Sequence, residues 1–193
     1  MRNTTQKILK WELVVAVCYF VILLIEMKFV FPVERVLLAE HRGITSLLFL
    51  PHAVRVLSTV IVGPKAFFVL FPTILASGYF LFESYGGVMS MPLIVDAAIG
   101  AGCAPIAYLA VKWAYRNTAD FKLTLMNWRM VLLIGAVASV LNSVMRVTLL
   151  GNTKTLSEVI QEATFLLVGD MTGLMVGLVV LVFIFRLVRR GQI

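Results

Sequence analysis

The sequence has little charge and few of the residues that build catalytic or metal centres. Only 14% of its 193 residues are charged, and it holds two cysteines and two histidines. Cys18 and Cys103 lie inside apolar runs without CxxC spacing, and His41 and His52 are too far apart to indicate a haem or metal site. Neither a Walker motif, an HExxH motif nor a Ser-His-Asp arrangement occurs. We therefore expect no enzyme, no cofactor and no metal site.

Apolar residues are abundant instead, at 61% of the chain. A soluble domain is about 45–50% apolar and about 25% charged. A chain this apolar has too little polar surface to cover itself in water, so lipid must be its solvent. Its apolar runs are continuous rather than alternating, which favours helices over a barrel. We predict an all-α, polytopic integral membrane protein with a single domain over residues 1–193.

Polar breaks divide the apolar sequence into six predicted transmembrane helices. Pro32 is expected to end the first, and the connection 33–45 should lie in water. The second and third are short and are interrupted by Pro51 and Pro72, so they form either a helical hairpin, which we favour, or a re-entrant pair. The six predicted spans are 11–31, 46–62, 66–82, 92–113, 130–150 and 161–188.

Positive charge is distributed unevenly between the two sides of these spans. Of 17 Lys and Arg residues, eleven fall on the side that holds both termini and three on the other side. Cytoplasmic loops carry an excess of Lys and Arg, so both termini are predicted to be cytoplasmic. Trp11, Trp113 and Trp128 fall at the predicted cytoplasmic ends, where tryptophan anchors helices. We interpret the net charge of +7 as such anchoring charge and not as a nucleic-acid-binding surface.

Several polar side chains lie within the predicted spans at a similar depth, in the outer half of the membrane. A charge in hydrocarbon costs about 2.5–3.5 kcal/mol, so such residues usually face protein, water or ligand. We predict that they surround one outward-opening cavity that binds a small anionic or carbonyl-bearing ligand. In the alternative interpretation they are structural, with Arg55 paired to Asp96 or Asp170. The predicted site residues are His52, Arg55, Asp96, Asn142, Arg146 and Asp170.

Glycine recurs at every fourth position in the last span, at Gly169, Gly173 and Gly177. This spacing forms a smooth stripe that permits close approach by another backbone. Contact within the chain is favoured over homodimerisation. The small-residue tract Ala97–Ala104 is the expected facing surface.

Several short motifs resemble those of a known family. They are Leu50-Pro51-His-Ala-Val-Arg-Val-Leu57, then Gly63-Pro-Lys-Ala66, then Gly169-Asp-Met-Thr-Gly173 ahead of an apolar span with a basic end. In order and spacing they resemble the bacterial membrane-associated sensor domains (the MASE group, first subtype). The resemblance implies a sensory, ligand-binding fold in the bacterial inner membrane with a role in signal transduction. That family normally precedes a kinase or cyclase module, and we expect none here, so the chain would act through a membrane protein partner.

Two other functions fit the same composition. One is the solute-binding subunit of a transporter, which size and helix number suit but which lacks the expected alanine-rich motif in the first span. The other is an accessory subunit that stabilises a larger membrane complex, with the polar residues acting as structural contacts.

Overall fold

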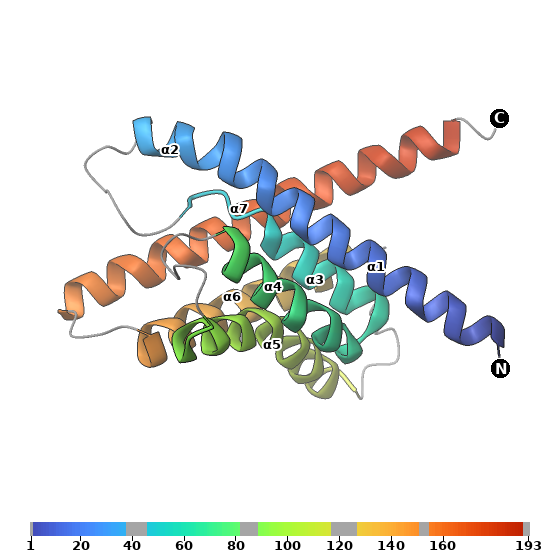
Figure 1. Ribbon diagram of the computed structural model, residues 1–193, viewed down its shortest axis with the longest axis horizontal. Helices are drawn as coiled ribbons and strands as arrows, with labels where there is room; N and C mark the ends of the chain where they lie inside the picture. Colours follow the sequence, from blue (N-terminus) through green and yellow to red (C-terminus); the bar gives the residue numbers. More distant parts are fainter. Residues whose placement is uncertain (1, 38–45, 82–88, 117–126, 151–154, 191–193) are drawn as a thin grey trace.

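The computed structural model describes residues 2–37, 46–81, 89–116, 127–150 and 155–190. Every regular element in this part of the chain is helical, as the all-α prediction requires. The elements labelled in Figure 1, with the two short turns η1 and η3, are α1 (Arg2–Ile25), η1 (Glu26–Val30, π-helical), α2 (Phe31–Leu37), α3 (Pro51–Val62), η3 (Pro64–Ala66, 3-10), α4 (Phe67–Leu81), α5 (Met91–Ala114), α6 (Trp128–Leu150) and α7 (Leu156–Arg190).

Five helical stretches are long and apolar enough to cross a membrane. They are Trp11–Val36, Pro64–Leu81, Met91–Ala114, Trp128–Leu150 and Leu156–Leu187. The last four predicted spans coincide with α4 to α7 to within a few residues at each end. The remaining apolar helix, α3, has 12 residues, which is about 18 Å at the α-helical rise. It is too short to cross a hydrocarbon core of about 30 Å by itself.

The N-terminal helix continues past Pro32, so the prediction that this proline ends the first span is wrong. Proline lacks an N–H, and in a regular α-helix its ring clashes with the carbonyl four residues earlier. Here the preceding turn, η1, is π-helical, and the Phe31 N–H bonds to the carbonyl of Glu26 five residues earlier. The wider turn accommodates the ring, and the helix continues as α2.

Part of the connection expected in water therefore belongs to this helix. Residues 33–37 are helical, and Glu34 is partly buried. The rest of that connection, 38–45 with His41, lies outside the described residues.

The second predicted span is helical only in its second part. Residues Ser46–Leu50, called the entry segment below, are not α-helical, and α3 begins at Pro51. Proline suits the first position of a helix because its missing N–H would have had no partner there. α3 then ends at Gly63, whose φ of 80° is readily available to glycine.

Three backbone N–H groups of the entry segment have partners elsewhere in the fold. Irregular backbone at membrane depth is tolerated only where protein or a water-filled cavity satisfies it. Two glutamates of the N-terminal helix and one carbonyl of α7 do so here. The Leu48 N–H donates to Glu34 Oε1 (3.1 Å), the Phe49 N–H to the Gly169 carbonyl (2.9 Å) and the Leu50 N–H to Glu26 Oε2 (2.8 Å).

α3 lies at the centre of the bundle and contacts α1, α5, α6 and α7. It contributes to a buried apolar cluster shared with α5, α6 and α7, and its Val54 packs against a second cluster formed by α1, η3, α4 and α5. In Figure 1 the long helices α1 and α7 cross in projection, and α3 lies near the crossing. Polar side chains on α3 are therefore surrounded by other helices.

Candidate functional site

The short central helix α3 carries two of the predicted site residues. His52 and Arg55 lie one turn apart and are only 2% and 4% exposed. Burying an ionisable group is costly unless it is paired, hydrogen-bonded or neutral. The partners of these two side chains therefore decide what the cluster can do.

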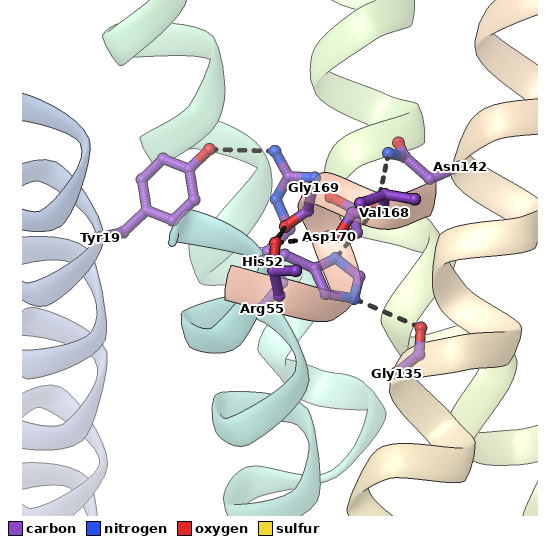
Figure 2. A network of polar contacts seen from close by, with 9 residues as sticks. Tyr19, His52, Arg55, Gly135, Asn142, Val168, Gly169 and Asp170 are labelled. Carbon is purple, nitrogen blue, oxygen red and sulfur yellow. Dashed lines mark hydrogen bonds and ion pairs between the residues drawn. The ribbon is translucent and has the colours of Figure 1, made fainter. Parts of the chain in front are cut away.

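His52 joins three helices, as Figure 2 shows. Its Nε2 lies 3.3 Å from the Gly135 carbonyl oxygen of α6, and its Nδ1 lies 3.5 Å from Asp170 Oδ2 of α7. The Asn142 amide of α6 donates to the same carboxylate oxygen at 3.1 Å. A carbonyl only accepts, so Nε2 must carry a hydrogen for that bond to form. The Nδ1 of His52 makes no hydrogen bond within the described residues, although Asp170 lies nearby.

Arg55 is held by aromatic side chains. Its Nη2 donates to the Tyr19 hydroxyl of α1 at 3.2 Å, and its Cζ lies 5.0 Å from the centre of the Phe49 ring. On α5, a Cβ added to Gly100 would lie 3.4 Å from the guanidinium carbon, so a glycine leaves room for Arg55 there. No carboxylate oxygen in the described residues lies within the 4.0 Å of an ion pair with this guanidinium. Arg55 is thus a buried cation without a carboxylate in direct contact, and Asp170 and Asp96 act on it only from beyond ion-pair distance.

Asp96 and Arg146 form a separate ion pair between α5 and α6. The guanidinium Nη2 contacts Asp96 Oδ1 directly, and the two side chains are 14% and 28% exposed. This pair is less buried than the groups around His52. A partly exposed pair of this kind is ordinary structural bonding between helices.

The structure thus divides the six predicted site residues into three groups. His52 and Asn142 both contact Asp170, Asp96 pairs with Arg146, and Arg55 makes no hydrogen bond or ion pair with the other five. The pairing of Arg55 with Asp96 or Asp170, on which the structural interpretation depended, is not formed.

Sequence reasoning did not assign Tyr19, Glu26, Ser139 or Ser143 to the site. Tyr19 and Glu26 are 2% and 0% exposed, seven residues apart on the N-terminal helix, with the buried Leu23 between them. Ser139 and Ser143 are likewise buried, four residues apart on α6. Polar residues at spacings of four and seven share one face of a helix, and this periodicity was the available signal.

The three glycines of α7 contact the entry segment and α3. A Cβ on Gly169 would lie 3.2 Å from the Ser46 carbonyl carbon, and one on Gly173 would lie 2.9 Å from the Leu50 nitrogen. The atoms nearest to a Cβ on Gly177 belong to Ala53. The expectation that the tract 97–104 faces this stripe is therefore wrong. The stripe lets α7 support a stretch of irregular backbone, and the α5 tract borders Arg55 instead.

Among the described residues, no group of three or more His, Cys, Asp or Glu side chains is arranged to hold a metal ion. Comparisons with protein-family models, with curated proteins and with solved structures found no match.

Proposed function

We propose that this chain is a non-catalytic binding module of the membrane, in which Arg55 recognises the anionic or carbonyl group of a small ligand. His52, Asn142 and Asp170 form the adjoining polar wall. The module acts as a sensor-like component that passes its ligand state to a membrane protein partner. The resemblance of its short motifs to the membrane-associated sensor domains supports this role.

The state of Arg55 is the observation that carries the proposal. Arg55 is 4% exposed, its guanidinium donates to the Tyr19 hydroxyl, and no carboxylate of the described residues lies within ion-pair distance of it. The Nε of this side chain also has no hydrogen-bond partner there. A hydroxyl and an aromatic face offset only part of the cost of burying a cation. An anionic or carbonyl oxygen is the partner that a guanidinium binds best.

We also propose how the chain is oriented and which membrane it occupies. α3 and the entry segment together would form the second of six spans, with both termini in the cytoplasm of a bacterial cell and the protein in its inner membrane. The asymmetry of Lys and Arg supports this orientation.

Arg55→Met tests the proposal, with the protein in lipid nanodiscs. Methionine removes a buried charge that no carboxylate contacts directly, so stability should remain near that of the wild type or rise. Acetate, glutamate and inorganic phosphate serve as probes in thermal unfolding. A probe that binds stabilises by about 2.7 kcal/mol at a concentration 100 times its Kd, and Arg55→Met should abolish this stabilisation. Equal stabilisation of both proteins would contradict the proposal.

Arg146 provides the matched control because its charge is paired. Arg146→Met leaves Asp96 without its cation, so the variant should lose stability, and adding Asp96→Asn should restore part of it. If Arg55→Met instead behaved in this way, losing stability that Asp170→Asn restored, the cluster would be structural and not a ligand site.

A further inference from the structure

Hydroxyl groups within the helices mostly bond to their own backbone. Seven of them donate to a carbonyl three or four residues earlier, as is usual for Ser and Thr in apolar helices. These seven are Ser58, Thr59, Thr73, Ser77, Thr148, Thr164 and Thr172. Their polar atoms are satisfied without help from outside the helix.

Ser139 and Ser143 of α6 do not follow this pattern. They are 0% and 3% exposed, yet neither hydroxyl has a hydrogen-bond partner among the described residues. The carbonyl four residues before Ser139, that of Gly135, is the one that accepts from His52 Nε2. The Asn142 Oδ1, on the same face of α6, is also buried and unpartnered, while its amide nitrogen donates to Asp170.

Three buried polar atoms on one helix face are expensive to leave unbonded. Each unsatisfied group costs about 1–3 kcal/mol, so together they would cost about 3–9 kcal/mol. A buried water normally makes two to four hydrogen bonds to such groups. Hydroxyl and amide oxygens spaced three and four residues apart provide suitable partners for it.

The same face leads towards the surface. Ser139, Asn142, Ser143 and Arg146 follow one another at helical spacing, and seven residues of α-helix rise about 10 Å. Arg146, at the far end, is 28% exposed, and its Nε has no partner in the described part of the chain. The polar face therefore connects a partly exposed ion pair with the carbonyl that binds His52.

We propose that this face of α6 is a hydrated lane, in which water bonded to Ser139, Asn142 and Ser143 connects the membrane surface near Arg146 with the His52–Asp170 pair. It admits water and small water-borne cations to the centre of the protein. The lane rests on the α6 polar atoms and does not require Arg55 to bind a ligand.

Cysteine substitution with silver ion as the probe tests the lane. Ag⁺ travels in water, not in lipid, and blocks thiols against later alkylation. In a background of Cys18→Ala and Cys103→Ala, in nanodiscs, Ser143→Cys and Ser139→Cys should be blocked by Ag⁺, the first faster than the second. The matched controls are Val140→Cys and Val144→Cys, whose positions are 47% and 54% exposed on the same helix and which we expect to face lipid. They should remain unblocked.

The outcome is decided by the contrast between the two faces of α6. Failure of Ag⁺ to block Ser143→Cys in folded protein, or equal blocking at all four positions, would overturn the lane. If the cysteine variants do not fold, a high-resolution experimental map of the unaltered protein decides instead. It should show water within hydrogen-bond distance of the Ser139 and Ser143 hydroxyls, and the lane is wrong if it does not. Either result leaves the Arg55 test intact, because that test measures ligand stabilisation.

Discussion

Replacing Gly173 by alanine should destabilise the protein although it adds only one methyl group. The new Cβ would lie closer than 3.0 Å to the Phe49 carbonyl oxygen and 2.9 Å from the Leu50 nitrogen. Both are backbone atoms of the entry segment, whose Phe49 and Leu50 N–H groups are already bonded to Gly169 and Glu26. The segment cannot retreat without losing those bonds.

The size of the effect follows from two opposing terms. Alanine favours a helix interior over glycine by about 0.5–1 kcal/mol, whereas overpacking costs about 1–3 kcal/mol and more where a buried hydrogen bond is also lost. We expect a net loss of about 1–3 kcal/mol. At about 2–4 °C for each kcal/mol in a chain of this size, the melting temperature in nanodiscs should fall by several degrees.

Gly102→Ala is the matched control on α5. The atoms nearest to its added Cβ are the ends of the Ile106 and Phe67 side chains, both 3.9 Å away. This variant should be as stable as the wild type or slightly more stable. If Gly173→Ala and Gly102→Ala melted at the same temperature, the close contact between α7 and the entry segment would not exist in the membrane.

Three further predictions follow from other parts of the fold. Glu26→Leu leaves the partly buried Leu50 N–H without its acceptor and should cost about 1–3 kcal/mol in thermal unfolding, whereas Glu26→Gln keeps an acceptor and should cost much less; equal losses would contradict this bond. His52→Gln, which can still donate to the Gly135 carbonyl, should melt above His52→Leu, and the reverse order would refute that hydrogen bond. Cysteines introduced at Gln192 and Thr153 should react with an impermeant thiol reagent only from the cytoplasm and only from outside, respectively; labelling of both from one side would exclude the six-span topology.

The sequence allowed the long helices to be predicted because continuous apolar runs have one stable solution in lipid. α5 and α6 begin and end within a few residues of their predicted bounds. The continuation of the N-terminal helix through Pro32 could not be predicted. Whether a proline ends a helix or follows a π-turn depends on the tertiary contacts made by the other residues of that turn. Here the turn holds Glu26, which bonds to Leu50 far along the chain.

The pairing of polar groups was harder to predict than their depth. Similar depth and shared helix faces placed His52, Asn142 and Asp170 in one region, but depth alone cannot say which cation meets which anion. Arg146 meets Asp96, and Arg55 meets Tyr19, whose importance is hidden in a uniformly apolar stretch. These contacts depend on how each helix is rotated about its axis, and that rotation is set only when all the helices pack together.

The π-turn in the N-terminal helix also sets an angular register. Glu26 and Glu34 are eight residues apart, and at 3.6 residues per turn they would point about 80° apart around a regular α-helix. The wider turn between them takes up an extra residue and reduces this offset, so that both carboxylates reach one short stretch of backbone, at Leu50 and Leu48. A single-residue deletion within Met27–Val30 would leave seven residues between the two carboxylates, which a regular α-helix places about 20° apart, so both would still face this stretch, whereas regular winding over all eight residues would turn Glu34 away from Leu48. Whether this turn is wound as a π-helix or as an α-helix therefore determines whether the N-terminal helix bonds to the entry segment at two points or at one.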